Sequence, residues 1–323
     1  MRLLISAIAL MASLSFCVSS KAAEQPVVDQ DIALVTTTGK IAGSLQLPSS
    51  AGKLPVVLII AGSGPTDRDG NSAPLKGKNN SLKMLAESMG QAGIASVRFD
   101  KRGIGASASA ATSEADLRFE TYVQDAAAWL KMLKADKRFS DVAILGHSEG
   151  SLIAMLAAQQ EPVKALISLA GPAKNAADLL RQQLQGKLPP PLAAKNEEIL
   201  AALQAGKTYT EVPAELKSLY RDSVQPYLVS WFRYTPEKEI GKLTCAILLV
   251  QGDKDVQVDV AQLSALKQAR PDASTLLVHE MNHVLKIING DMAQQMASYG
   301  DPALPLAPEL ALKLNGFLRE KLK

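Results

Sequence analysis

Short apolar runs alternate with helical patterns along most of the chain. Residues 31–48 alternate apolar and polar side chains around Thr38-Gly39, which predicts the two strands of a β-hairpin. Six further runs are almost wholly apolar and rich in β-branched residues, and they predict buried strands: 54–62, 94–99, 142–146, 163–171, 245–252 and 274–279. Helical patterns lie among these runs at 81–91, 119–135, 149–160, 258–269 and from about 308 to the end. The alternation predicts an α/β fold whose mostly parallel central sheet is flanked by helices.

One interval, residues 172–243, contains no strand pattern. It consists of helix-like stretches broken by KLPPPL at 187–192, by Gly206 and by Pro213. Ligands bind at the carboxyl ends of parallel strands, and the interval leaves the sheet from one of these ends. We therefore expect residues 172–243 to form a helical cap insertion rather than a structural extension. The core domain then comprises residues 23–171 and 244–323.

The first 22 residues have the pattern of a secretory signal peptide. Arg2 precedes an apolar run that reaches about Val18, and the small residues of Ser20-Lys21-Ala22 resemble a cleavage site. The run is interrupted by serines and is shorter than the roughly 20 apolar residues that a membrane span needs. We expect an exported protein, periplasmic or extracellular, without stable membrane insertion after cleavage.

Charge and cysteine content exclude several classes of partner and scaffold. Removing residues 1–22 takes away Arg2, Lys21 and no acid, so the formal charge falls from +3 to +1. This balance, the absence of a dense Lys/Arg cluster and an aromatic content of 4% argue against a nucleic-acid partner. Cleavage would also remove Cys17 and leave Cys245 alone, so a disulfide framework is excluded. Stability must then come from a packed core.

The stretch GHSEG at 146–150 places Ser148 between a predicted strand and a predicted helix. A tight turn at such a junction pushes the serine hydroxyl out above the sheet. Gly146 and Gly150 are then required because the turn brings backbone close to backbone, where a Cβ would clash. A serine that only capped the helix would account for neither glycine. We therefore expect Ser148 to be a nucleophile.

A serine nucleophile needs a base, and the base needs a group that orients it. The chain has three histidines. His147 adjoins the serine and is expected to point elsewhere, and His279 ends the last predicted strand, whereas His283 lies in the loop beyond and can reach Ser148. The acid should follow an earlier core strand, in QGDKDVQV at 251–258. Asp253 directly follows that strand and is expected to shape the turn, so we select Asp255.

Five motifs resemble those of the α/β-hydrolase superfamily, and Ser148, Asp255 and His283 keep its order of nucleophile, acid and histidine. The motifs are GHSEG (146–150), QGDKDVQV (251–258), NHVLK (282–286), IIAGSGPTDRDGNS (59–72) and FDKRGIGAS (99–107). The last two also resemble exported or bacterial esterases that are grouped with serine-aminopeptidase-like hydrolases. The resemblance covers most of the chain after the signal segment and fits the cap only loosely.

The resemblance implies acyl transfer without a cofactor or a metal. Ser148 would attack the acyl carbonyl, His283 would take and return the proton, and Asp255 would hold the imidazole. The backbone N–H groups of Glu149 and Ser63 would form the oxyanion hole. The family's usual His-Gly in the latter loop is replaced by Ala61-Gly62, which leaves the choice between Ser63 and Gly64 open.

A competing pattern is HEMNH at 279–283, which matches the His-Glu-x-x-His motif of zinc proteases. That motif requires both histidines on one helix face, whereas the preceding STLLV predicts a strand. No third histidine follows, and the only later glutamates are Glu309 and Glu320. A zinc metalloprotease is therefore a distant alternative, and a non-catalytic binding scaffold is a third.

The leading function is hydrolysis of small-molecule carboxylic esters with short acyl chains. An aminopeptidase or a thioesterase could use the same three residues. Tyr227, Trp231 and Phe232 in QPYLVSWFRY (225–234) could line an acyl pocket or could pack the cap against the sheet. Arg68 in DRD (67–69) could contact a polar end of the substrate, although a salt-bridged structural loop is the simpler interpretation.

Overall fold

The structure, a computed structural model, describes residues 27–50 and 52–323. The predicted signal peptide lies outside this range. Within it, one sheet contains eight strands in the spatial order β1-β2-β4-β3-β5-β6-β7-β8. Their bounds are β1 (Val27–Thr36), β2 (Gly39–Pro48), β3 (Leu54–Ile60), β4 (Ala95–Phe99), β5 (Phe139–His147), β6 (Ala165–Leu169), β7 (Ala246–Gly252) and β8 (Ser274–Val278). Each predicted strand is present.

The strand directions place a crevice at the centre of the sheet. The β1–β2 hairpin is antiparallel, and β2 also pairs antiparallel with β4. All other pairs, from β4 across to β8, are parallel. The chain leaves β3 for β4 on one side and then returns to β5 on the other. The loops after β3 and β5 therefore diverge at the topological switch point, where open α/β sheets bind their ligands.

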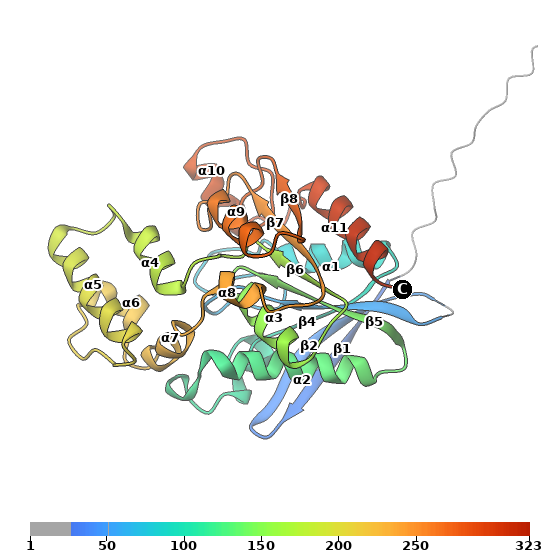
Figure 1. The fold of residues 1–323 in the computed structure, drawn as a ribbon, viewed down its shortest axis with the longest axis horizontal. Helices are drawn as coiled ribbons and strands as arrows, with labels where there is room; N and C mark the ends of the chain where they lie inside the picture. Colours follow the sequence, from blue (N-terminus) through green and yellow to red (C-terminus); the bar gives the residue numbers. More distant parts are fainter. Residues whose placement is uncertain (1–26, 51) are drawn as a thin grey trace, which may run out of the picture.

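Helices cover both faces of the sheet (Figure 1). The core helices are α1 (Ser81–Gln91), α2 (Phe119–Ala135), α3 (Glu149–Gln160), α9 (Val260–Ala269), α10 (Met292–Ala297) and α11 (Pro308–Lys321). Short 3₁₀ turns are η1 (Gly105–Ala110), η2 (Glu114–Asp116) and η4 (Ser298–Gly300). The patterns at 81–91, 119–135 and 149–160 predicted α1, α2 and α3 with the observed bounds. The hydrophobic pattern did not reveal α10, which has six residues.

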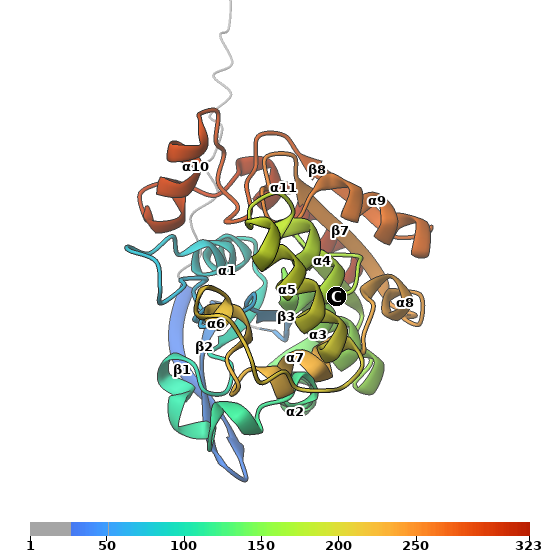
Figure 2. The ribbon, with the colours of Figure 1, turned by 90° about the vertical axis from the view of Figure 1, so that its left-hand side faces the viewer.

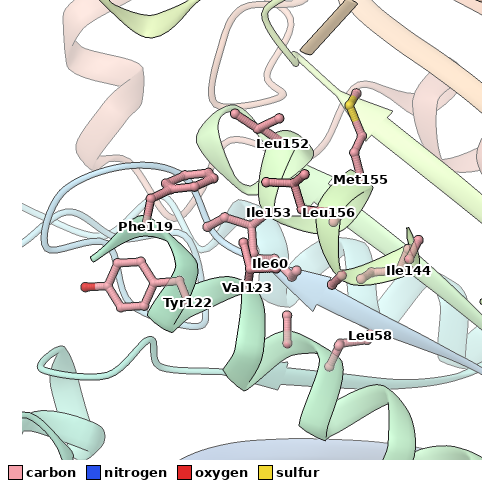
Figure 3. Packing of buried hydrophobic residues seen from close by; sticks show 14 of the residues in the cluster. Leu58, Ile60, Phe119, Tyr122, Val123, Ile144, Leu152, Ile153, Met155 and Leu156 are labelled. Atoms are coloured by element: carbon pink, nitrogen blue, oxygen red, sulfur yellow. The ribbon is translucent and has the colours of Figure 1, made fainter. Parts of the chain in front are cut away.

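The strand β3 illustrates how the sheet joins two cores. Its side chains alternate between the faces, and those at 56, 58 and 60 pack with α2 and α3 in one buried cluster. Those at 57 and 59 pack with α1 and α11 in a second cluster. Figure 3 shows the first cluster, in which Ile60 lies near Ile153 of α3 and Val123 of α2. Burial on both faces explains why these strands are continuously apolar in sequence.

The predicted cap interval, 172–243, contains α4 (Ala176–Leu184), α5 (Pro190–Gln204), η3 (Ala214–Leu216), α6 (Lys217–Tyr220), α7 (Gln225–Trp231) and α8 (Pro236–Ile240). Figures 1 and 2 show α4 to α7 grouped beyond one end of the sheet. Phe119 N donates to Ser230 Oγ at 2.7 Å, which ties α7 to the start of α2. No helix in the described part of the chain is both long and apolar enough to cross a bilayer.

Candidate active site

Ser148 occupies a strained turn between β5 and α3. Its backbone has φ 55° and ψ −122°, a region that residues with a Cβ adopt only where the surroundings enforce it. Its N–H donates to Leu169 O of β6 at 2.9 Å, which fixes the turn to the sheet. The serine side chain makes no capping hydrogen bond to α3. The geometry is therefore that of a half-buried serine on a sharp turn and not that of a helix cap.

The two glycines that flank Ser148 permit this turn. A Cβ added to Gly146 would lie 2.0 Å from Gly150 O, and one added to Gly150 would lie 2.5 Å from Ile60 O. Across the crevice, a Cβ on Gly62 would lie 3.3 Å from the Cβ of Ser148. The predicted close approach of backbone to backbone is thus present, and it also brings the loop after β3 against the serine.

We expect Gly146→Ala to lower the free energy of unfolding by about 3 kcal/mol or more, because its Cβ meets backbone that cannot move aside. Gly316→Ala is the matched control, since Gly316 lies exposed in α11 and its added Cβ meets nothing within 4 Å. That change should raise stability by about 0.5–1 kcal/mol through helix propensity. Urea unfolding of both variants measures the difference, and similar values for the two would contradict this packing.

Asp255 and His283 form a buried pair. His283 Nδ1 lies 2.7 Å from Asp255 Oδ2, with the side chains 6% and 0% exposed. Burial by itself would raise the pKa of Asp255, but the His283 ring and the backbone N–H groups of Val258 and Gln257 together hold that pKa below its ordinary value. The carboxylate therefore stays ionised and accepts a hydrogen bond from Nδ1–H. This leaves Nε2 of His283 as the ring's free acceptor.

Gln251, the penultimate residue of β7, forms hydrogen bonds with the loop that carries Asp255. Its Nε2 donates to Asp255 Oδ2 at 3.0 Å and to Val258 O at 2.7 Å. Gln251 was not among the site residues predicted from the sequence. Its place one residue before Gly252, at the carboxyl end of a core strand, was the available signal.

His147 packs against His283. The two ring centroids are 4.8 Å apart, and His147 Nε2 lies 2.9 Å from His283 O. Complete burial, followed by the neighbouring His283 ring, lowers the pKa of His147 to about 3. The ring is thus neutral at physiological pH, and because a carbonyl only accepts, Nε2–H of His147 donates. The His147 ring thus points to the backbone of His283, a contact that the sequence did not predict.

The Ser148 hydroxyl and His283 Nε2 do not form a hydrogen bond among the described residues. Hydrogen bonds between a nucleophile and its base are commonly long before substrate binds and shorten in the reacting complex. The two side chains are nevertheless brought together, because His147 directly precedes Ser148 and contacts His283.

A second Asp–His pair lies at the surface. His279 Nδ1 is 2.6 Å from Asp253 Oδ2, and the His279 side chain is 78% exposed. Asp253 Oδ1 also accepts from Glu280 N at 2.6 Å, which agrees with a role in shaping the turn. Residues 279–283 form a turn and a β-bridge, with Met281 opposite Ile287. The helix that the zinc motif requires is not formed, so the two imidazoles pair with different carboxylates instead of sharing one face.

A pocket of about 630 Å³ lies between the sheet and the helices of 172–243, with Ser148 in its wall. Loops after five parallel strands contribute to it: Ser63 to Pro65 after β3, Lys101 to Ile104 after β4, Ser148 and Glu149 after β5, Pro172 after β6, and Gln257 and Val258 after β7. Apolar side chains from α4, α6 and α7 form the opposite wall, among them Leu179, Leu180, Leu219 and Leu228. Its volume suits a small organic molecule.

Two of the three predicted pocket aromatics line this space. Tyr227 and Trp231 are in the pocket wall, and the Trp231 ring also stacks on Phe119 of α2 at 5.7 Å between centroids. Both interpretations of these aromatics therefore hold at once. The prediction for Phe232 is wrong: this residue follows the end of α7, where its side chain is buried in the core cluster, and it does not line the pocket.

Arg68 is a structural residue in this geometry. Its Nη2 lies 2.8 Å from Asp100 Oδ2, and its Nη1 donates to Ser44 Oγ at 3.1 Å. Arg68 does not line the pocket. Of the two interpretations of Arg68, the structure therefore supports the salt-bridged structural loop.

The predicted oxyanion donors adjoin Ser148. Glu149 opens α3, where the first N–H groups of a helix have no acceptor within the helix. Ser63 follows Gly62, the residue that approaches Ser148, and its N–H has no acceptor within the described residues. Ser63 and Glu149 both line the pocket beside Ser148. Gly64 is one residue further from this contact, which favours Ser63.

The chain has the α/β-hydrolase fold, with a strained serine after β5, a buried Asp–His pair after β7 and β8, and a helical interval between β6 and β7. The family model described as serine aminopeptidase, S33, matches residues 78–227. A curated relative, esterase EstD of Thermotoga maritima, is 27% identical over 252 residues, which are 77% of this chain. The match spans 59% of the relative's own length.

Solved structures with the same fold include other esterases. Est1E of Butyrivibrio proteoclasticus with ferulic acid bound has a TM-score of 0.59 and 20% identity, over 90% of this chain and 98% of that one. Esterase Pf2001 of Pyrococcus furiosus has a TM-score of 0.54 and 15% identity, over 92% of this chain and 94% of that one. At these identities the likeness shows the fold.

Proposed function

We propose that the protein is a serine hydrolase that cleaves small carboxylic esters through an acyl-enzyme on Ser148. The observation that carries the proposal is the position of Ser148, on a strained turn in the pocket wall beside the buried Asp255–His283 pair. Similar proteins support the substrate class, since EstD and Pf2001 are named as esterases.

Acylation follows from the geometry of these groups. Ser148 Oγ attacks the acyl carbon, and its proton passes to Nε2 of His283. Asp255 keeps Nδ1–H in place and stabilises the imidazolium that forms. The N–H groups of Ser63 and Glu149 hold the oxyanion of the tetrahedral intermediate. When the intermediate collapses, the alcohol leaves with the proton from Nε2, and the acyl group remains on Oγ.

Deacylation repeats the steps with water. Nε2 of His283 takes a proton from water as its oxygen attacks the acyl carbon, and the same N–H groups hold the second oxyanion. Collapse breaks the bond to Oγ, which takes the proton back from Nε2. The carboxylic acid is released, and Ser148 is restored. No step requires a cofactor.

The pocket favours an ester with a small uncharged acyl group over an aminoacyl substrate. An aminopeptidase must bind a substrate ammonium group, for which a carboxylate is the usual partner. The two carboxylates that line the pocket are already paired, Glu149 with Lys101 at 2.9 Å and Glu114 with Arg221. The apolar wall of Leu179, Leu180 and Leu219 instead suits the acyl chain.

Hydrolysis of p-nitrophenyl esters of increasing chain length, compared with an aminoacyl p-nitroanilide and an acyl thioester, tests the proposal. We expect kcat/KM to be highest for short acyl esters and much lower for the aminoacyl amide. Ser148→Ala, assayed in parallel, corrects for spontaneous hydrolysis. A higher kcat/KM for the aminoacyl amide would contradict the proposed substrate class, and activity that only a chelator abolishes would contradict the mechanism.

A further inference from the structure

Lys101 is a buried lysine that contacts both loops of the proposed oxyanion hole. It follows β4, and its side chain is 2% exposed. Its Nζ donates to Gly62 O at 2.6 Å and lies 2.9 Å from Glu149 Oε1, a carboxylate whose side chain is also 2% exposed. The same Nζ lies 5.1 Å from the centroid of the Tyr122 ring. The mechanism described above assigns it no role.

The contact with Gly62 fixes the orientation of the first oxyanion donor. Gly62 C=O and Ser63 N–H belong to one planar peptide group, and the described backbone contains no cis peptide bond. In a trans peptide the C=O and the N–H point in opposite directions. Because Lys101 Nζ holds the Gly62 oxygen, the Ser63 N–H points the opposite way across the peptide, and Ser63 lines the pocket together with Ser148. The bond to a cation also polarises the peptide and strengthens its N–H as a donor.

The contact with Glu149 anchors the second donor. Glu149 supplies its backbone N–H from the first position of α3, and its carboxylate is held by Lys101. One ammonium group therefore links the loop after β3 to the start of α3, across the switch point of the sheet. Glu149 also neutralises the lysine, so the pair presents no net charge that would retain an anionic substrate.

The neighbouring cation has a separate function. Arg102 forms a bidentate pair with Asp125 of α2, at 3.0 Å and 2.6 Å, and contacts neither Gly62 nor Glu149. Two consecutive basic residues after β4 thus serve different parts of the structure. Of these two residues, only Lys101 connects the two segments that carry the oxyanion donors.

We propose that Lys101 is a positioning residue that sets the geometry of the oxyanion hole through Gly62 O and the Glu149 carboxylate. The proposal rests on the proposed esterase function. Lys101 touches the backbone and a side chain of the site, and its effect on the reaction is transmitted through the N–H groups of Ser63 and Glu149. Because these donors act on the tetrahedral state more than on the bound ester, the effect should fall on kcat and leave KM nearly unchanged.

Lys101→Met tests this, since methionine fills similar space without a charge or a donor. We expect kcat for p-nitrophenyl acetate to fall by roughly 10²-fold, the smaller effect in the range for losing one oxyanion donor. Phenylboronic acid forms a tetrahedral adduct on an active-site serine, so its affinity should fall with kcat. Burst titration with the same ester counts the reactive Ser148 in each preparation, so unfolded protein does not enter the result.

Two further variants separate positioning from simple stabilisation. Lys286→Met removes another fully buried lysine, whose Nζ donates to Leu304 O at 2.6 Å, and measures the general cost of such a change. Lys101→Arg keeps the charge and the pair with Glu149, but its planar fork cannot reproduce a single ammonium bond to Gly62 O. We expect Lys101→Arg to fold, to have a reduced kcat and to keep the wild-type KM. Lys286→Met should keep the wild-type kcat per titrated serine.

The outcomes are distinct. A folded Lys101→Met with the wild-type kcat per titrated serine, or a Lys101→Arg variant that restores kcat fully, would overturn the positioning role. A loss divided equally between KM and kcat, with unchanged affinity for phenylboronic acid, would also overturn it. Failure of the proposed function is recognised separately, because wild-type protein would then show neither burst nor ester hydrolysis that depends on Ser148.

Discussion

Replacing Ser148 with alanine is expected to lower kcat for ester hydrolysis by about 10⁶-fold, the effect of removing the nucleophile from a serine, acid and histidine site. The loss follows from chemistry, because no other group in the pocket wall is placed on the turn above β5 to attack the acyl carbon. Initial rates on p-nitrophenyl acetate measure it. The melting temperature should change little, since the serine side chain makes no capping hydrogen bond.

Ser151→Ala is the matched control one turn further along the same helix. Ser151 is fully buried, and its Oγ lies 2.6 Å from Ser168 Oγ, so its loss should cost about 1 kcal/mol of stability and leave the chemistry in place. If Ser148→Ala keeps the wild-type rate, or if Ser151→Ala is equally inactive, Ser148 is not the nucleophile.

Asp255→Asn is expected to lower kcat by about 10⁴-fold while substrate binding is retained. The asparagine has nearly the same shape, but its amide can donate to Nδ1 of His283, which stabilises the tautomer with the proton on Nε2. Nε2 then cannot accept the Ser148 proton. Steady-state kinetics on the short-chain ester, with KM reported alongside kcat, distinguishes this effect from damage to the pocket.

Asp253→Asn is the matched control for the same substitution in the same loop, because Asp253 pairs with a histidine at the surface. His279 is 78% exposed, whereas His283 is 6% exposed. We expect Asp253→Asn to retain most of the wild-type kcat. A larger loss for Asp253→Asn than for Asp255→Asn would show that the exposed pair is the functional one and that the chosen acid and base are wrong.

Much of the fold could be predicted because its strands are buried on both faces. A strand such as β3 has no polar side chain to obscure it, and α1 and α2 beside it have amphipathic patterns. The turn at Ser148 could be predicted because two glycines are needed where backbone meets backbone. By contrast, α10 was missed because six residues do not form a recognisable helical period.

The supporting groups of the site could not be predicted because their contacts join segments far apart in the chain. Lys101 in FDKRG meets Glu149, 48 positions later, and His147 meets His283, 136 positions later. Both residues lie within recognised motifs, but nothing local indicates the distant partner of either. Phe232 was wrongly predicted for a different reason. A cluster of aromatic residues in the sequence does not reveal which ring lines the pocket and which is buried in the core.

The covalent intermediate on Ser148 is the central claim, and labelling by a fluorophosphonate tests it most directly. The reagent reacts with a serine that an adjacent base has activated, and peptide mapping by mass spectrometry then locates the adduct. We predict one adduct, on the peptide that contains Ser148, with labelling strongly slowed in His283→Ala and unchanged in His279→Ala. Ester hydrolysis that continues while no adduct forms, or an adduct on another residue, would contradict the account.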